Sequence, residues 1–395
     1  MRVCLGHNAK VVMMIFFTAM SFVLFATVFT SRVYRGRLLN EQAKLTLTPS
    51  VAHLNDNDND DDHAPEWKED VEKSEAEWDS DDDEDYEEKE EGENTLEVKY
   101  RAYKCSDSSS EGRHVVVTSL LVSESREYLM GALVLGRALQ NQIKWMSQAA
   151  SSSSPSSTAA AQVDMILMVL DDFSLSNTTS ANLAKVGWQV CRVPLIESGF
   201  QEKVLPRFQK IFAKAAPFTW TQYERFIFMD LDTLPVGNLS DLFFPPSSSS
   251  SSKNTSCGFN AAFDYEAGNF KGHFNSGVFA SCPSLKTFDF FMNFIKTRED
   301  YRIIMGDQGV LNKLADLKVF RVDPISWDYN ANLAIFESNK KLWDSHGQGQ
   351  IKIIHFTTAK PFNYLKDPKA LQRTWAPVQL WFEQYELLNK ELSLT

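Results

Sequence analysis

The chain has 395 residues, with 52 Asp and Glu against 40 Lys and Arg, and a formal net charge of −12. Two average domains would fit this length, but composition varies so strongly along the chain that we expect one large folded domain. Nothing in the acidic balance indicates a nucleic-acid partner, and none is expected.

Residues 11–30 form an uncharged, apolar stretch near the N-terminus. Eleven of these 20 residues are Val, Ile, Leu or Phe. As a helix they would span about 30 Å, which is the thickness of a bilayer core. The stretch predicts a transmembrane signal anchor after a short tail, residues 1–10. A cleaved signal peptide is the alternative, although its apolar region is usually only about 7–15 residues long.

An acidic segment follows this stretch. Residues 55–93 hold 22 Asp and Glu against 3 Lys, a net charge of −19. Such a segment has too little apolar surface to offset the chain entropy lost on folding, so we expect residues 31–112 to form a disordered stem. Calcium binding by these carboxylates is the alternative. Without residues 55–93 the chain has 30 acidic and 37 basic side chains, an excess of positive charge that suits an anionic ligand.

From residue 113 to about residue 390, apolar and β-branched runs alternate with helical patterns. Continuously apolar runs are typical of strands buried on both faces, and their alternation with helices predicts an α/β fold around a mainly parallel sheet. Two Ser-rich segments, residues 147–161 and 247–256, are expected to be loops. The expected strands are residues 114–122, 163–170, 187–193, 226–229, 274–281 and 351–355, and the expected helices are residues 127–146, 208–216, 284–296 and one that begins at Asp307.

The cysteines are Cys4, Cys105, Cys191, Cys257 and Cys282. They show no CxxC pair and no zinc-ligand spacing, which excludes a zinc framework. In an oxidising lumen we expect one or two disulfides among the last four, and the sequence leaves their pairing open.

Two acids, Asp230 and Asp232, follow the apolar strand 226–229. In an extended backbone, residues i and i+2 point to the same face, so the two carboxylates are expected to lie close together. At about 4 Å they would repel by about 4 kcal/mol at an effective dielectric constant of about 20, and a bound divalent cation would remove that cost. Oxygen ligands at the carboxyl end of a strand favour Mg²⁺ or Mn²⁺.

This stretch has three alternative interpretations. Asp232 and the three residues after it are also typical of an ordinary turn. A phosphohydrolase of the aspartyl-phosphate type would carry Asp-x-Asp-Gly-Thr near the start of its domain, and here the Gly is missing. A P-loop NTPase would carry the motif Gly-x4-Gly-Lys-Ser/Thr before these acids. Gly131 and Gly136 have the glycine spacing of that motif, but Arg137 and Ala138 stand where the Lys and the Ser or Thr would be. The turn stays open, and the phosphohydrolase stays a distant alternative.

Five sequence blocks together resemble the retaining nucleotide-sugar glycosyltransferases of family 8, which include glycogenin and the plant glycogenin-like glucuronosyltransferases. The blocks occur in the family's order and cover nearly all of the expected domain. The resemblance implies a single GT-A domain, which is a Rossmann-like α/β fold. The blocks are EYLMGALVLGRAL (127–139), FAKAAPFTWTQYERFIFMDLDTL (212–234), FNSGVFASCPS (274–284), GDQGVLNKL (306–314) and IIHFTTAKPFNY (353–364).

The resemblance implies a metal centre in which Asp230, Asp232 and His355 bind Mn²⁺, with Mg²⁺ as the alternative ion, and the metal binds the donor diphosphate. It also implies that Lys360 approaches the diphosphate and that Lys214 contacts the donor. Taken alone, a single His on an apolar strand and two lysines would be ordinary structural or surface residues.

Further site residues follow from the same resemblance. Each of them also has an ordinary structural interpretation, such as helix capping for Asp307. The resemblance implies that Tyr128 stacks on uracil, that Asn275, Ser276 and Gly277 lie near the donor sugar, and that Asp307 and Gln308 lie near the anomeric carbon.

The implied function is transfer of a hexosyl group, glucose or glucuronic acid, from a UDP-sugar to a glycan, glycolipid or protein acceptor with retention of configuration. Same-face attack and a covalent intermediate on Asp307 are both open. The basic residues that flank residues 11–30 do not decide its orientation, so the expected location, a Golgi or other secretory membrane with a luminal domain, rests partly on the resemblance. A homodimer is left open.

The chain departs from the family pattern at three positions. Ile304 stands where glycogenins have an acid, and Thr358 and Phe362 replace the usual Gly and Trp. These departures motivate the alternative of a catalytically inactive lectin-like or scaffolding relative. Residues 330–336 contain no Tyr, which argues against self-glucosylation, and the stretch YNANLAIFESNKKLW (329–343) is more similar to the plant branch.

Overall fold

The computed structural model describes residues 93–103, 105, 115–123, 125–153, 163–245, 258–298, 305–345, 350–366 and 375–392. They all belong to one compact unit that spans Tyr86–Thr395. The predicted membrane stretch, residues 11–30, and most of the acidic segment lie outside the described residues. Among the helices that the structure describes, none is both long and apolar enough to cross a membrane.

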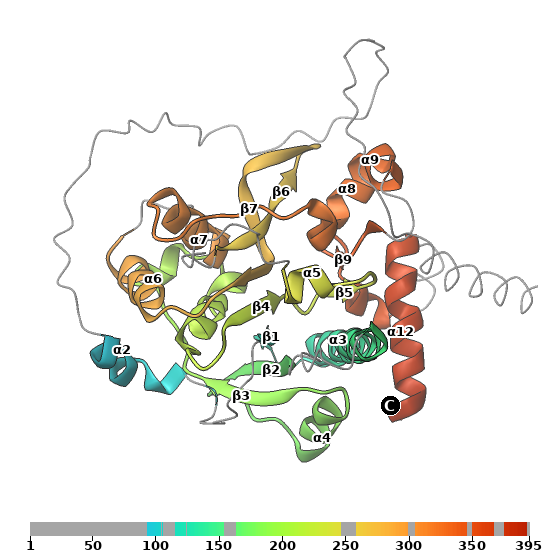
Figure 1. Ribbon diagram of the computed structural model, residues 1–395, viewed down its shortest axis with the longest axis horizontal. Helices are drawn as coiled ribbons and strands as arrows, with labels where there is room; N and C mark the ends of the chain where they lie inside the picture. Colours follow the sequence, from blue (N-terminus) through green and yellow to red (C-terminus); the bar gives the residue numbers. More distant parts are fainter. Residues whose placement is uncertain are drawn as a thin grey trace, which may run out of the picture. The chain divides into compact units, whose positions relative to one another are not determined.

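A six-stranded mixed sheet forms the centre of the domain (Figure 1). In spatial order its strands are β3 (Gln189–Val193), β2 (Val163–Leu170), β1 (Val115–Leu121), β4 (Arg225–Met229), β7 (Asn269–Ser281) and β6 (Asn260–Glu266). The first four are parallel to one another, and β7 is antiparallel to both β4 and β6. β1 and β2 are buried along almost their whole length, as their continuously apolar sequences predict. The α/β fold is confirmed, with an antiparallel edge added to the parallel strands.

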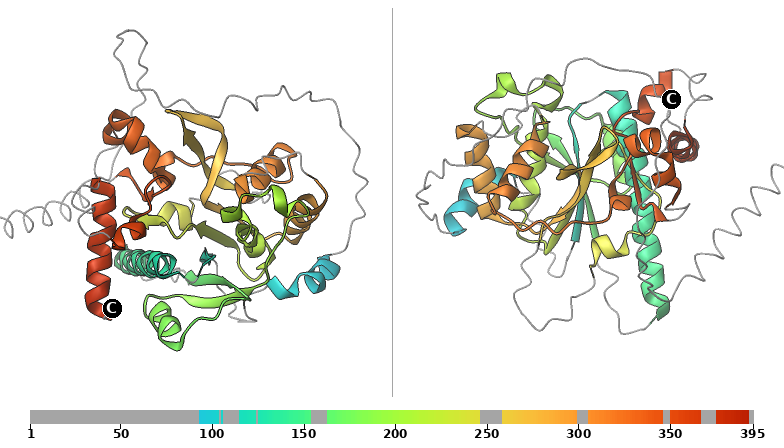
Figure 2. Two further views of the ribbon diagram at one scale, coloured as in Figure 1. Left: turned by 180° about the vertical axis from the view of Figure 1, so that it is seen from behind. Right: turned by 90° about the horizontal axis from the view of Figure 1, so that it is seen from above.

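Helices cover both faces of this sheet. The main helices are α3 (Arg126–Ser153), α4 (Asn177–Lys185), α6 (Leu285–Thr297), α7 (Asp307–Asp316) and α12 (Ala376–Leu392). α3 and α12 pack against each other on one side, and α6 and α7 lie on the other (Figure 2). α6 begins where the sequence predicts, because the Ser284 hydroxyl accepts a hydrogen bond from the Thr287 backbone N–H and caps the helix.

Two predicted segments differ from the structure. α3 continues into the Ser-rich segment 147–161 and ends at Ser153. Every residue of the helix has the backbone N–H that a helix needs, and Pro155, which has none, comes after its end. The helix predicted over residues 208–216 is instead a 3₁₀ run, η4 (Ile211–Thr219), in which Pro217 removes one donor. The remaining short elements are η1 (Arg101–Tyr103), η2 (Gln201–Lys203), η3 (Pro206–Phe208), α5 (Ser240–Phe243), η6 (Trp327–Asn330), α8 (Leu333–Ser338), α9 (Lys340–Ser345) and η7 (Pro361–Lys366).

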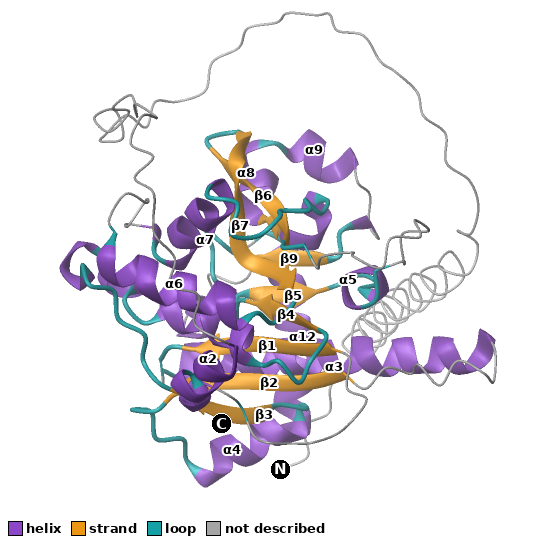
Figure 3. Ribbon diagram, turned by 60° about the vertical axis from the view of Figure 1, so that its left-hand side comes forward, coloured by secondary structure: helices purple, strands orange, loops and turns teal. Residues whose placement is uncertain are grey.

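A second sheet of three short strands lies beside the main sheet (Figure 3). The sequence predicted one of its strands, within residues 351–355, but neither the other two strands nor the sheet. Its order is β5 (Thr233–Pro235), β9 (Ile353–His355) and β8 (Ala331–Asn332). His355 is in register with Thr233 on one side and with Asn332 on the other. The small sheet therefore brings three segments that are far apart in the sequence to the end of β4.

The C-terminal end of the predicted stem is folded. α2 (Glu93–Lys99) packs against α6, and Tyr100 donates a hydrogen bond to Asp289 at 2.5 Å and lies edge-on to Phe288. Leu96 and Tyr100 are each only 5% exposed. The disorder predicted for residues 31–112 is therefore wrong for this end of the segment, where buried apolar side chains offset the cost of ordering.

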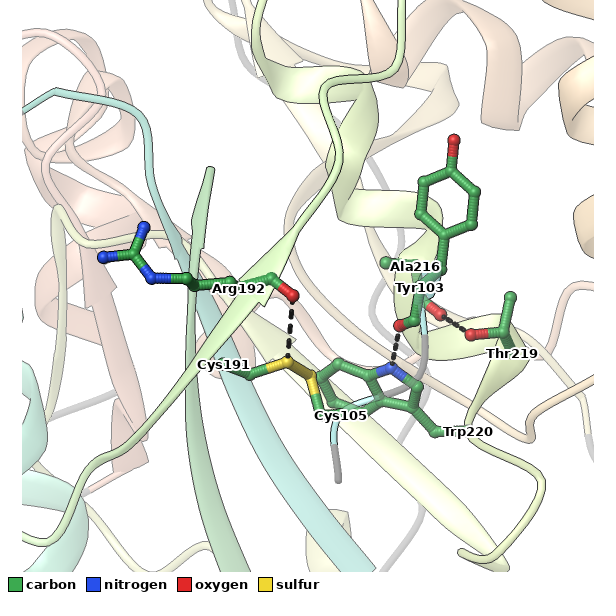
Figure 4. Close-up of a disulfide and its surroundings, with 7 residues drawn as sticks. All are labelled: Tyr103, Cys105, Cys191, Arg192, Ala216, Thr219 and Trp220. Carbon is green, nitrogen blue, oxygen red and sulfur yellow. Dashed lines mark hydrogen bonds between the residues drawn. A yellow bond between two sulfur atoms is a disulfide. The ribbon is translucent and has the colours of Figure 1, made fainter. Parts of the chain in front are cut away.

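A disulfide between Cys105 and Cys191 ties this N-terminal segment to β3 (Figure 4). Beside it, Trp220 Nε1 donates a hydrogen bond to the carbonyl of Tyr103 at 2.9 Å. Cys282 is also disulfide-bonded. The expectation of disulfides is confirmed, and the Cys105–Cys191 pairing, which the sequence left open, joins residues 86 positions apart.

Replacing both Cys105 and Cys191 by Ser is expected to lower the free energy of unfolding by about 2–4 kcal/mol, because the unfolded chain loses a long cross-linked loop. Urea unfolding of the full-length chain, followed by tryptophan fluorescence, measures this loss. A change of less than about 0.5 kcal/mol, the range of an ordinary surface substitution, would contradict the structural role of this disulfide.

Candidate active site

The two acids lie in a tight turn where β4 ends. The Thr233 backbone N–H donates to the Asp230 carbonyl at 3.1 Å, and the Thr233 hydroxyl donates to the same carbonyl at 2.7 Å. The Asp230 N–H donates to the Gly277 carbonyl at 2.7 Å. The backbone is thus a turn rather than the extended strand assumed from the sequence. The turn interpretation is confirmed, and it is compatible with a ligand role because this turn presents both carboxylates at the edge of the sheet.

His355 completes a cluster with the two acids. It is in register with Thr233, and the Phe356 N–H donates to the Asp232 carbonyl at 2.9 Å. Ligand atoms of Asp230, Asp232 and His355 all lie within 4.8 Å of one another, and His355 Nε2 is 3.5 Å from Asp232 Oδ1. Two carboxylates and an imidazole nitrogen are ligands that Mn²⁺ and Mg²⁺ accept, so this donor set fits a divalent cation.

Gly277 in β7 makes room for the imidazole ring. A Cβ atom at this position would lie 2.1 Å from Cε1 of His355, far inside contact distance. Only a residue without a side chain lets the ring lie against the β7 backbone. The group that approaches the β7 backbone closely at Gly277 is therefore the side chain of His355.

Lys214 joins the cluster of Asp230, Asp232 and His355 to Asp307. Its Nζ lies 2.9 Å from Asp230 Oδ1 and 3.2 Å from Asp307 Oδ2. Burial opposes protonation of Lys214, but the carboxylates of Asp230 and Asp307 outweigh it and hold the pKa of Lys214 above its usual range. Lys214 is therefore charged at neutral pH.

Lys360 forms an ion pair with Asp232 at the more open side of the cluster, where its side chain is 34% exposed. Burial alone would raise the pKa of Asp232, but the positive charge of Lys360 beside it holds that pKa well below its usual range. Asp232 therefore stays ionised, which is the form that binds a metal.

Asp307 and Gln308 begin α7 and face β7. Asp307 is 2% exposed, and burial raises its pKa, an effect that Lys214 partly offsets. Gln308 Oε1 accepts from the Ser276 N–H at 3.2 Å, and its Nε2 donates to Asp264 Oδ2 at 2.9 Å. The structure thus brings Asp307, Gln308 and Ser276 together, as the sequence led us to expect.

A network of buried amides connects these residues and was not predicted. Asn275 Nδ2 donates to Asp264 Oδ1 at 3.1 Å, and Asn330 Nδ2 donates to Asn275 Oδ1 at 2.9 Å. Asn332 Nδ2 also donates to Asp264 Oδ1, at 3.3 Å. The only signal in the sequence is the pair of Asn at positions i and i+2 within residues 329–343, a spacing that turns both side chains to one face of a strand.

A second cluster with ligand atoms within 4.8 Å of one another consists of Asp264, Glu266 and His273. His273 Nε2 is 3.9 Å from Asp264 Oδ2. Both oxygens of Asp264 already accept hydrogen bonds, Oδ1 from three donors and Oδ2 from Gln308. Because amide donors occupy the central carboxylate, this cluster fits a structural acceptor better than a cation site.

The departures at residues 358 and 362 are accommodated locally. Phe362 is 1% exposed and packs against the half-buried Tyr128, with ring centroids 5.4 Å apart. Thr358 donates a hydrogen bond to Glu337. Ile304 lies outside the described residues. Phe362 therefore fills the position of the usual Trp with a buried ring that packs against Tyr128.

No protein-family model matches the chain. The chain is 25% identical over 278 residues to inositol phosphorylceramide glucuronosyltransferase 1 of Arabidopsis thaliana, a match that covers 65% of this chain and 44% of that protein. It is 30% identical over 226 residues to putative UDP-glucuronate:xylan alpha-glucuronosyltransferase 5 of the same plant, covering 56% of this chain and 33% of that protein. With glycogenin-1 of Homo sapiens the identity is 26% over 253 residues, covering 61% of each.

Two solved structures are also similar to the chain. The glycosyltransferase GlyE of Streptococcus pneumoniae TIGR4 has a TM-score of 0.44 and 16% identity, over 71% of this chain and 63% of that one. The galactosyltransferase LgtC has a TM-score of 0.40 and 14% identity, over 69% of this chain and 95% of that one. The relatives of this chain are glycosyltransferases. The predicted resemblance to glycogenin and the plant glucuronosyltransferases is confirmed, and the chain spans between 33% and 61% of the length of the three relatives named above.

Gly277→Ala is expected to weaken Mn²⁺ binding by about 10–100-fold, because the added Cβ displaces the imidazole that completes the cluster. Gly272→Ala in the same strand is the matched control, since its Cβ would meet nothing within 4 Å. Titration of each full-length variant with Mn²⁺ measures the affinities. Equal affinities for the two variants would show that His355 does not need the space at Gly277.

Lys214→Met is expected to lower the free energy of unfolding by about 3–5 kcal/mol, because it leaves the buried Asp307 and the partly buried Asp230 without their positive partner. Lys210→Met is the control from the same segment, since Lys210 pairs with Asp172 on the surface with a side chain 42% exposed. That substitution should cost less than about 1 kcal/mol. Urea unfolding measures both, and a loss at Lys214 no larger than at Lys210 would contradict the assigned charge balance.

Proposed function

We propose that this chain is a retaining glycosyltransferase that transfers a hexosyl group from a UDP-sugar to a glycan, glycolipid or protein acceptor. The proposal is carried by the convergence of Asp230, Asp232 and His355 with two lysines at the end of β4. Such an arrangement can hold a divalent cation and a diphosphate together, because it offers ligands to the first and positive charge to the second. The glycosyltransferase relatives support the same assignment.

Asp230, Asp232 and His355 would hold Mn²⁺, with Mg²⁺ as the alternative ion. When bound, the ion would stabilise the negative charge that grows on the leaving diphosphate. Lys360 would bind the diphosphate from the more exposed side, and the buried Lys214 would add positive charge from the interior. Electrostatic stabilisation of this kind usually contributes most to catalysis.

We assign the donor sugar to the region of Asn275, Ser276 and Gly277, which Gln308 faces. The anomeric carbon would lie near Asp307. Asp307 would act as a covalent nucleophile, or it would support same-face attack in which the donor phosphate takes the proton of the acceptor. Tyr128 would stack on uracil, and its contact with Phe362 supports a fixed ring position.

Glucuronic acid and glucose are the proposed donor sugars, because the relatives are named as glucuronosyltransferases and glycogenin. We propose a Golgi or other secretory-pathway membrane as the location, with residues 11–30 as the anchor and the domain in the lumen. The disulfide between Cys105 and Cys191 supports an oxidising compartment.

The full-length chain with Mn²⁺ is expected to release UDP from at least one member of a UDP-sugar panel, with UDP-glucose and UDP-glucuronic acid as the leading donors. Asp232→Asn should reduce this release at least about tenfold, because the metal loses a charged ligand. Asp172→Asn, at a carboxylate 59% exposed, is the control and should leave the rate unchanged. A coupled assay for UDP measures all three proteins.

Two outcomes would contradict the proposal and favour another function. Binding of Mn²⁺ and UDP without release from any donor, in the presence of a range of acceptors, would indicate an inactive lectin-like or scaffolding relative. Hydrolysis of a generic phosphate ester in place of sugar transfer would indicate the phosphohydrolase alternative.

A further inference from the structure

Asn330 is a buried amide that contacts both the metal cluster and the donor-sugar side. It ends η6 and is 3% exposed. The pairing of β8 with β9 sets Asn332 in register with His355 and brings Asn330 beside the imidazole ring. Asn330 Oδ1 lies 2.9 Å from His355 Nδ1, and Asn330 Nδ2 lies 2.9 Å from Asn275 Oδ1.

Two neighbouring groups determine which atom of the Asn275 amide accepts and which donates. The Gly277 N–H can only donate, and it donates to Asn275 Oδ1 at 2.9 Å. Asp264 Oδ1, which already accepts from the Tyr265 backbone N–H at 2.9 Å, accepts from Asn275 Nδ2 at 3.1 Å. Asn275 therefore has one orientation, with its oxygen toward Asn330. An oxygen there needs a donor, so Asn330 turns its Nδ2 to Asn275 and its Oδ1 to His355.

We propose that Asn330 is a positioning residue that keeps His355 in the tautomer with its proton on Nδ1. An amide oxygen can only accept, so its hydrogen bond with Nδ1 requires the proton on that nitrogen. Nε2 then carries the lone pair, and Nε2 is the nitrogen 3.5 Å from Asp232 Oδ1. A neutral imidazole that directs this lone pair at a cation is the form that binds a metal. The inference rests on the proposed function, because it assigns Asn330 to the metal site of that function.

Two contacts hold the ring in this position. The backbone of Gly277 lies against it, and Asn330 holds its Nδ1 edge. Asn330 uses its oxygen for His355 and its nitrogen for Asn275, so the two contacts of this amide can be separated by substitution. Asn330→Asp keeps an acceptor for Nδ1 and loses the donor to Asn275. Asn330→Leu, which has a similar size, loses both.

The test measures Mn²⁺ binding to the full-length chain by electron paramagnetic resonance, which needs no turnover. Each protein is compared with its Asp232→Asn counterpart, so that binding by the acidic segment is subtracted. Asn330→Leu is expected to weaken the Asp232-dependent binding about 10–100-fold, the usual effect of losing a group that orients a metal-binding His. Asn330→Asp is expected to restore binding, because its carboxylate still accepts from Nδ1.

Asn312→Leu is the control for loss of a buried amide. The Asn312 side chain hydrogen-bonds to the backbone of Phe274. Asn312→Leu is therefore expected to leave the Mn²⁺ affinity unchanged. A second readout is nitrogen NMR spectroscopy of the metal-free chain labelled at histidine, with His355→Gln to assign the signal. The wild type should show the proton of His355 on Nδ1, and Asn330→Leu should lose this preference.

The outcomes separate this inference from the proposed function. Unchanged Asp232-dependent binding in Asn330→Leu, or a proton on Nε2 in the metal-free wild type, would overturn the role of Asn330 and leave the proposed function intact. Absence of Asp232-dependent binding in the wild type would overturn the metal site and the inference with it. If Asn330→Leu does not fold, the tautomer of His355 in the wild type decides the question.

Discussion

Mutual repulsion among the carboxylates of Asp230, Asp232 and Asp307 is the constraint on which the rest of this site depends. Asp232 and Asp307 are 7% and 2% exposed, so water screens their charges poorly. Lys214 and Lys360 supply positive charge on two sides, and a cation bound with His355 would supply the remainder. Burial strengthens each of these attractions and also raises the cost of leaving any charge unpaired.

Backbone hydrogen bonds hold the carboxylates in place despite their mutual repulsion. The turn after β4 is held by hydrogen bonds to β7 and to the chain after β9, so the carboxylates are placed by the two sheets rather than by a loose loop. Two glycines allow the close approaches that this requires. A Cβ at Gly277 would collide with the imidazole, and a Cβ at Gly131 would lie 2.9 Å from the carbonyl of Leu231, where α3 passes over the turn.

Much of the fold and most site residues could be predicted, and the differences have physical reasons. Asp230, Asp232 and His355 lie in blocks that carry the resemblance, and the structure brings them together. In the second sheet only β9 was predicted, within residues 351–355. The other two strands, β5 and β8, are three and two residues long, which is too short for a periodic pattern. Asp264 belongs to none of the quoted blocks, and Asn330 lies in the stretch 329–343, for which the sequence indicated no role at the site. A hydrogen-bond network of this kind depends on directions in space that residue spacing does not encode. The folded end of the acidic segment was missed because its few apolar residues matter only once they are buried against α6.

The central claim is that Asp230, Asp232 and His355 hold a divalent cation next to the donor diphosphate. The most direct test is diffraction from crystals grown with Mn²⁺ and UDP, measured at the manganese absorption edge, where anomalous scattering locates the ion. The account predicts a peak at coordination distance from an oxygen of each Asp and from Nε2 of His355. A peak at Asp264 and His273 instead, or no peak beside the three predicted ligands, would contradict it.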